Sequence, residues 1–214
     1  MRLFLADGVH AVHVRDDLVF LDTQADAYFC LGGVLDIIAL SPHGEVDITH
    51  AETAEHLLEA GLLSERMLTG RRPPPPRPDA SSWLTRAEGS PPLGVCAAAF
   101  SVTWSAARNF RRRSFAALLQ DAPSVAALTA EPSAALVQAA TQFESLRPWL
   151  PLSGECLLRS YHARAFLRAR GFDALWVFGV RTWPFSAHCW LQVGLTALDD
   201  DLERLAAYTP IMAV

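Results

Sequence analysis

Three residue types that together support nucleophilic catalysis occur in order near the end of this sequence. Cys156 lies in the segment ECLLRSY, His188 in FSAHCWLQV, and the run Asp199-Asp200-Asp201 follows. A thiolate is a strong nucleophile, an imidazole can take up and return its proton, and a carboxylate can hold the imidazole in one orientation. The order predicts a Cys-His-Asp site. The alternative is three unrelated features, namely a capped helix, a core histidine and a solvated acidic turn.

The segment around Cys156 is expected to form a helix that favours the thiolate. Ser153 follows two prolines and is a good N-cap residue, and apolar residues then recur toward Gly171. Cys156 would therefore occupy the third helical position. The unpaired backbone amides and the positive end of the helix dipole stabilise a thiolate there.

The segment around His188 reads as a pair of strands. Residues 174–180 form a continuous apolar run, which suits a buried strand, and residues 186–193 alternate. Alternation places His188 on one face of the second strand and Cys189 on the other, so Cys189 is assigned to packing. A short returning strand at 195–198 would bring the three aspartates back toward His188.

The rest of the chain is predicted to contain further helices and strands. Apolar spacing predicts helices over the ranges 34–40, 49–61, 93–109, 111–120 and 132–146. Alternating runs between polar turns predict a three-stranded meander over the ranges 10–14, 18–22 and 27–31.

A proline-rich stretch divides the chain. Four consecutive prolines, Pro73 to Pro76, cannot continue a helix or a central strand, and they favour an extended spacer. We therefore expect an N-terminal domain over residues 1–68, a linker over 69–88 and a second domain over 89–214.

Composition excludes several classes of protein. The 214 residues carry a net charge of −5, which argues against general nucleic-acid binding, and no apolar run is long enough for a membrane span. Asp7 ends the first apolar run too early for a secretory signal, and the four scattered cysteines contain no CxxC pair, so reduced thiols in a cytoplasmic protein are expected. The sequence predicts no metal site and no cofactor, and it leaves an ATP requirement open.

The motifs of the C-terminal half resemble the leader peptidases of lasso-peptide biosynthesis, which have a papain-related, transglutaminase-like fold. The resemblance rests on the runs Cys156 to Ser160, Gly179 to Arg181, Pro184 to Trp190 and Asp199-Asp200. It implies that Cys156 is the nucleophile, His188 the general base and Asp200 the orienting carboxylate, with Asp199 and Asp201 as alternates. Gln192 stands where the family often has Glu. Trp183 and Phe185, on the loop before His188, are candidates for the substrate pocket.

The N-terminal half is similar to the precursor-recognition element of the same system, a winged-helix-like module. The resemblance implies that a leader peptide binds as an added strand beside Ala27, Tyr28, Phe29, Cys30 and Leu31, with Leu57 and Leu58 closing a groove. The resemblance of the C-terminal motifs to the leader peptidases also implies that the released core passes to an asparagine-synthetase-like cyclase.

The combined expectation is an α+β protein with a winged-helix-like recognition module followed by a papain- or transglutaminase-like cysteine protease domain. The predicted function is hydrolysis of the leader–core bond of a lasso precursor peptide. Two alternatives stay open. The same triad could transfer the acyl group to an amine, or the protein could be a non-catalytic carrier of the precursor.

Overall fold

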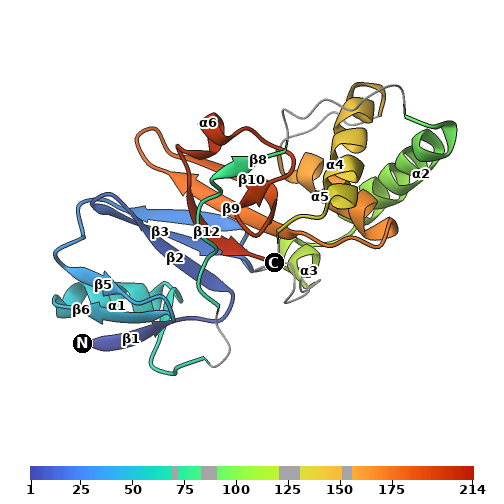
Figure 1. Ribbon diagram of the computed structural model, residues 1–214. Helices are drawn as coiled ribbons and strands as arrows, with labels where there is room; N and C mark the ends of the chain where they lie inside the picture. The colour runs from blue at the N-terminus through green and yellow to red at the C-terminus, as the bar shows by residue number, and fades with distance from the viewer. Residues whose placement is uncertain (69–71, 83–90, 121–130, 151–155) are drawn as a thin grey trace.

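The computed structural model describes residues 1–68, 72–82, 91–120, 131–150 and 156–214. The described chain forms three sheets and a group of helices. Two small sheets come from the N-terminal half, and a five-stranded sheet lies between them and the helices α2, α4 and α5 (Figure 1).

The three-stranded meander predicted near the N-terminus is confirmed. It consists of β2 (Val9–Val14), β3 (Asp17–Asp22) and β4 (Ala27–Leu31), antiparallel and in that order. Alternation gives the sheet two different faces, and both are covered. Leu18 and Phe20 point into an N-terminal core, whereas Val19 and Leu21 point into the core of the C-terminal half.

A second N-terminal sheet replaces part of the helical structure that the sequence predicted. Its strands run in the order β5 (Ile38–Leu40), β6 (Glu45–Ile48), β1 (Arg2–Leu5) and β7 (Leu63–Ser64). The helix predicted over 34–40 is therefore wrong. The short apolar run at 37–40 had no periodicity to separate helix from strand, and pairing with Val46 to Ile48 across a turn at Gly44 makes it a strand.

The helix predicted over 49–61 is present as α1 (Ala51–Glu59). Gly61 follows it with a φ of +70°, the left-handed conformation that ends many helices. α1 is the one α-helix among the described residues of the N-terminal half. A winged-helix form is accordingly not confirmed for this half, which combines two small sheets with α1.

The C-terminal half begins with helices that pack in one group. They are α2 (Leu93–Phe110), α3 (Phe115–Leu119), α4 (Ala134–Leu146), a short 3-10 turn (Arg147–Trp149) and α5 (Cys156–Ala169). The helix predicted over 111–120 is shorter than expected. Ser114 accepts a hydrogen bond from the Ala117 backbone N–H and caps a new, five-residue helix, so residues 111–114 lie outside it.

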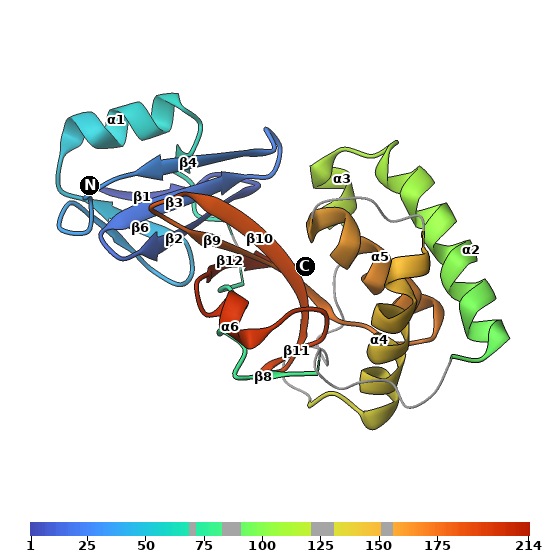
Figure 2. The same ribbon diagram turned by 90° about the horizontal axis from the view of Figure 1, so that it is seen from above.

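The C-terminal sheet has the strand order β12-β9-β10-β11-β8. Its members are β12 (Thr209–Ala213), β9 (Leu175–Arg181), β10 (Ser186–Val193), β11 (Thr196–Ala197) and β8 (Ala80–Ser81). The short helix α6 (Leu202–Leu205) precedes β12. Figure 2 shows β9 and β10 extending from the helices to the N-terminal sheets.

Packing crosses the proline-rich stretch. The residues Val14, Val19 and Leu21 of the meander belong to the same hydrophobic core as α2, α4, α5, β9 and β10. The edge strand β8 lies within the range expected to be linker, and Pro76 accepts a hydrogen bond from Gln192. The division at 1–68, 69–88 and 89–214 stays a prediction about chain organisation, while the side chains of both halves share one interior.

Candidate active site

Helix α5 places Cys156 at its first residue. The predicted N-cap, Ser153, lies outside the described residues. A buried hydrogen-bond network holds this end of the helix on the sheet: the Ser160 hydroxyl donates to the Cys156 carbonyl at 2.8 Å and accepts from Trp176 Nε1 on β9 at 2.7 Å. The position of Cys156 against β10 is therefore set by buried polar contacts as well as by apolar packing.

Strand β10 presents His188 opposite Gly179 of β9. The His188 ring lies near the rings of Trp190 and Tyr208 and is largely buried. Gly179 makes this arrangement possible, because a Cβ atom there would lie 2.7 Å from the Trp190 ring. The predicted alternation holds: His188 and Trp190 share one face, and Cys189, Leu191 and Val193 enter the core on the other.

Among the three consecutive aspartates, Asp200 contacts His188. His188 Nε2 and Asp200 Oδ2 are 2.6 Å apart. Interaction with Cys156 also raises the pKa of His188, so the sulfur lies near the imidazole. The structure therefore brings Cys156, His188 and Asp200 together, with His188 and Asp200 in hydrogen-bond contact.

The two neighbouring aspartates have other partners. Asp199 accepts a hydrogen bond from the Leu191 backbone N–H at 2.7 Å, and Asp201 caps α6 by accepting from the Glu203 N–H at 3.1 Å. The carboxylates of Asp199 and Asp201 are therefore each bonded to a backbone amide. Asp200 is the aspartate whose carboxylate contacts the imidazole of His188.

Electrostatics favours an ion pair between thiol and imidazole. Interaction with Cys189 lowers the pKa of Cys156 most and burial raises it, but Cys189 and His188 together bring this pKa down to about 4. Burial would lower the pKa of His188, but the contacts with Asp200 and Cys156 raise it to about 9. A thiolate beside an imidazolium is therefore the expected state at neutral pH.

The two buried aspartates of the turn have pKa values shifted in opposite directions. Burial opposes ionisation of Asp200, but hydrogen bonds from His188 and from the Asp201 N–H, together with Arg159, lower its pKa to about 2. Burial raises the pKa of Asp199 to about 7 despite the attraction of Arg159. Asp199 and Asp200 therefore have different pKa values, because their surroundings differ.

Cys189 has a second contact besides its packing. Its side chain is buried, its sulfur lies 3.3 Å from Ser160 Oγ, and it interacts with the Cys156 side chain. Burial and the neighbouring sulfur raise the pKa of Cys189 well above its ordinary value. Cys189 therefore stays a neutral thiol, and it can donate to the Cys156 thiolate.

Arg159 completes the cluster and received no individual role from the sequence. Arg159 Nη2 lies 2.6 Å from Asp200 Oδ2. Residues 156, 159 and 160 are three and four positions apart, so one side of a helix presents all of them. That spacing was visible in the sequence, but the partner of Arg159 was not.

The predicted leader-binding residues lie on an outer strand. Within the part of the chain that the structure describes, β4 pairs with β3 alone. Phe29 is 44% exposed and Cys30 is exposed, whereas Tyr28 packs toward the C-terminal core. Leu57 does not line a groove, because it is 5% exposed and belongs to the N-terminal core; Leu58 is partly buried beside that core.

The two pocket candidates lie against the meander. The Tyr28 and Phe185 rings are 5.6 Å apart, and Trp183 Nε1 donates to Asp17 Oδ2 at 2.7 Å. Burial raises the pKa of Tyr28, and negative charge on nearby groups, including Cys156, raises it further. The meander, including Tyr28 of β4, and the loop bearing Trp183 and Phe185 are therefore neighbours in space.

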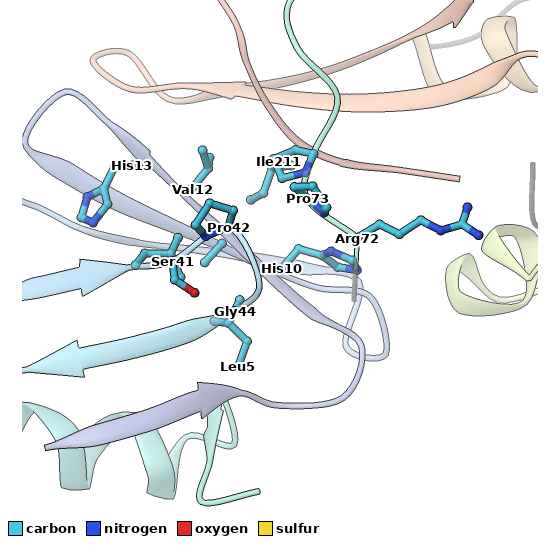
Figure 3. A pocket seen from close by; sticks show the side chains of 13 residues that line it. Leu5, His10, Val12, His13, Ser41, Pro42, Gly44, Arg72, Pro73 and Ile211 are labelled. Atoms are coloured by element: carbon cyan, nitrogen blue, oxygen red, sulfur yellow. The ribbon is translucent and has the colours of Figure 1, made fainter. Parts of the chain in front are cut away.

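A separate pocket of about 440 Å³ is lined by residues other than the cluster around Cys156. Figure 3 shows that side chains of the N-terminal half, the proline-rich stretch and β12 surround it, among them Leu5, His10, Pro42, Arg72 and Ile211. Across the described ranges, no three His, Cys, Asp or Glu side chains group in a way that could hold a metal ion. The described helices also include none with the length and apolarity to cross a membrane.

Comparison with known proteins identifies the class. Residues 98–213, more than half of the chain, match the transglutaminase-like superfamily, and the chain belongs to that superfamily. A shorter segment of 46 residues is 44% identical to the microcin J25-processing protein McjB of Escherichia coli. This segment spans 22% of each of the two chains. No solved structure matches the chain.

Proposed function

We propose that the protein is a cysteine peptidase that removes the leader from a lasso precursor peptide. The observation that carries the proposal is the continuous contact from Cys156 through His188 to Asp200, within a transglutaminase-like domain. The similarity to a microcin-processing protein supports a ribosomally made peptide as the substrate.

The geometry suggests the roles of the three residues. The Cys156 thiolate attacks the carbonyl carbon at the leader–core junction, and the His188 imidazolium protonates the leaving amine. A thioester with the leader results, and the core is released. His188, now neutral, takes a proton from water, which attacks the thioester and frees the leader. Asp200 holds Nε2 of His188 throughout, so that Nδ1 faces the sulfur.

Strand β4 is proposed as the site where the leader binds. Its outer edge has no partner strand among the described residues, and an extended peptide can hydrogen-bond to such an edge. One row of side chains on an added strand would face the side of Phe29, and the other would face Tyr28 and the loop with Trp183. Tyr28 and Cys156 both pack against the C-terminal core, which supports delivery of the bound peptide to the thiol.

We also assign the next step to a partner protein. The released core would pass to an asparagine-synthetase-like cyclase, which closes the macrolactam ring. This step depends on the family resemblance of the C-terminal motifs.

Mass spectrometry with a lasso precursor peptide that carries its leader tests the chemistry. The wild-type protein should yield a leader and a core whose masses add up to the mass of the precursor plus one water. Cys156→Ala should abolish cleavage, and Cys96→Ala, a partly buried cysteine on α2, should cleave normally. An intact precursor with the wild type would favour the carrier, and a leader carrying an added amine would favour acyl transfer.

A binding measurement tests the role of β4. In the Cys156→Ala background, we expect Phe29→Arg to weaken binding of the fluorescently labelled leader by about tenfold or more, because Phe29 is exposed beside the free edge. Leu35→Arg is the matched control, since Leu35 is 49% exposed and lies outside the strand. Equal affinity for both variants would place the leader elsewhere.

A further inference from the structure

We propose that Arg159 is the positioning residue of the site and holds the Asp200 carboxylate against His188. Helix α5 would then supply both the nucleophile and the anchor of the orienting acid. This inference rests on the proposed function, because it assigns a role within the same site.

The geometry places Arg159 and His188 on one oxygen atom. Asp200 Oδ2 lies 2.6 Å from Arg159 Nη2 and 2.6 Å from His188 Nε2. The Asp200 side chain is 4% exposed and that of Arg159 is 18% exposed. Charge-assisted hydrogen bonds of this length, shielded from water, constrain the carboxylate strongly. Arg159 lies one helical turn beyond Cys156, so the contact also fixes the carboxylate relative to the sulfur.

The other contacts of Asp200 hold it less firmly. Its Oδ1 accepts from the backbone N–H of the next residue, Asp201, at 2.9 Å. Arg204 Nη1 is 3.8 Å from the same oxygen, and its side chain is 57% exposed. Both groups belong to the segment that carries Asp200 itself. Arg159 links Asp200 to a different element, the 14-residue helix that bears Cys156.

The charges around Arg159 explain why a cation is needed there. Asp199, Asp200 and Glu144 all act on Arg159, and Glu144 also pairs with Arg147 at 2.9 Å. The charged and titratable groups that face Asp200 come from three elements and from the turn that carries Asp200 itself. They are Arg159 on α5, His188 on β10, Arg204 on α6 and the adjacent Asp199 and Asp201, with Cys156 beyond the imidazole. Without Arg159, the buried Asp199 and Asp200 would lose a cation that attracts both, and the carboxylate at His188 would lose its direct bond to helix α5.

The test measures the thiolate directly and needs no peptide substrate. In the full-length protein, the rate of Cys156 alkylation by iodoacetamide is followed against pH, with the modified residue identified by mass spectrometry. Arg159→Met should move the midpoint of the rate upward by about one pH unit or more, because a displaced carboxylate no longer stabilises the imidazolium. An unchanged or lowered midpoint in a folded variant would overturn the proposal.

Two further variants separate positioning from direct attraction and from misfolding. If Arg159 acts through Asp200, Arg159→Met adds no further shift in an Asp200→Asn background; the same shift in both backgrounds would show that Arg159 acts directly on the thiol. Arg159→Lys keeps the charge but loses the planar geometry, so it should fold and show a smaller upward shift. A midpoint for Arg159→Lys equal to that of the wild type would contradict a role that depends on geometry.

Arg168→Met is the matched control on the same helix. Arg168 pairs with Asp173 at 3.2 Å, away from Cys156, and its removal should leave the midpoint unchanged. A shift as large as that of Arg159→Met would mean that any lost charge on α5 has this effect, which would reject the positioning role. Failure of the wild-type protein to cleave a precursor would reject the proposed function without moving these midpoints, so the two failures are distinguishable.

Discussion

At the scale of single residues, three identical side chains in a row have three different environments. Asp199 binds a backbone amide of β10, Asp200 binds His188 and Arg159, and Asp201 caps α6. The three side chains have different partners because successive residues of the turn point in different directions. The function proposed for each follows from its partner rather than from its type.

The first prediction separates two of these acids by their effect on activity. Asp200→Asn should lower kcat/KM by about 10²- to 10⁴-fold, since the amide cannot stabilise the imidazolium as a carboxylate does. Asp201→Asn should change kcat/KM by less than about threefold, because Asn also caps helices well. Precursor cleavage followed by chromatography measures both. A larger loss of kcat/KM in Asp201→Asn than in Asp200→Asn would show that Asp201, and not Asp200, orients His188.

The second prediction concerns pH. The pKa of Cys156 is lowered to about 4 and that of His188 is raised to about 9, so the ion pair exists between these values. We expect kcat/KM to rise as pH increases through about 4, where the thiol ionises. It should fall through about 9, where the imidazolium that protonates the leaving amine is lost. A rising limb near the ordinary thiol pKa would contradict the ion pair.

At the scale of elements, helix α5 is notable for the polar residues on its buried side. Cys156, Arg159 and Ser160 belong to the site, whereas His162 is fully buried away from it. Both ring nitrogens of His162 lack a hydrogen-bond partner among the described residues, and burial lowers its pKa to about 4. The helix therefore contains a group that opposes folding whenever it is protonated.

The third prediction follows from that histidine. The pKa of His162 in the folded protein lies below its ordinary value of 6.5, so on acidification the unfolded chain binds the proton first. His162 therefore costs no stability above pH 6.5, and the free energy of unfolding decreases as pH falls from 6.5 toward 4. His162→Phe removes this dependence, and its free energy of unfolding relative to wild type should increase on acidification, by roughly 3 kcal/mol at most. Urea unfolding at pH 7.5, 6 and 4.5 measures the difference. A constant difference across these pH values would show that His162 does not titrate in this range.

At the scale of the whole molecule, the meander joins the two halves. One face of β3 packs into the N-terminal core and the other packs against the C-terminal half. The loop before His188 also contacts the meander. Trp183 of this loop donates a hydrogen bond to Asp17, and Phe185 contacts Tyr28. Strand β4 and the candidate active site therefore belong to one packed unit.

The fourth prediction is that both halves unfold together. Leu21 is fully buried on the face of β3 toward the C-terminal half, so Leu21→Ala should cost about 2–5 kcal/mol. All six tryptophans lie after the proline run, so their fluorescence reports mainly the C-terminal half, with Trp183 also in contact with Asp17 of the meander. The midpoint of the fluorescence transition in urea should fall in Leu21→Ala. A shift seen by circular dichroism but not by fluorescence would mean that the halves unfold independently.

The elements predicted well are those whose local pattern agrees with their environment. Periodic apolar spacing indicated α2, α4 and α5, and alternation indicated the meander and β10. Where the pattern was short or interrupted, the prediction failed. The run at 37–40 suited a helix or a strand equally. No strand was predicted at β12, which contains Pro210; β12 tolerates a proline because it lies at the edge of its sheet.

The amino-acid sequence by itself determined the chemical inventory of the site: a cysteine at a helix start, a histidine on a strand and an acid after the next turn. Residue types and their spacing are local properties, and they can be read from one chain. Only the tertiary structure decided which aspartate meets His188, that Arg159 shares its oxygen, and that Cys189 touches the thiol. Those contacts join residues far apart in sequence, and their directions depend on how helix α5 packs against β10 in three dimensions.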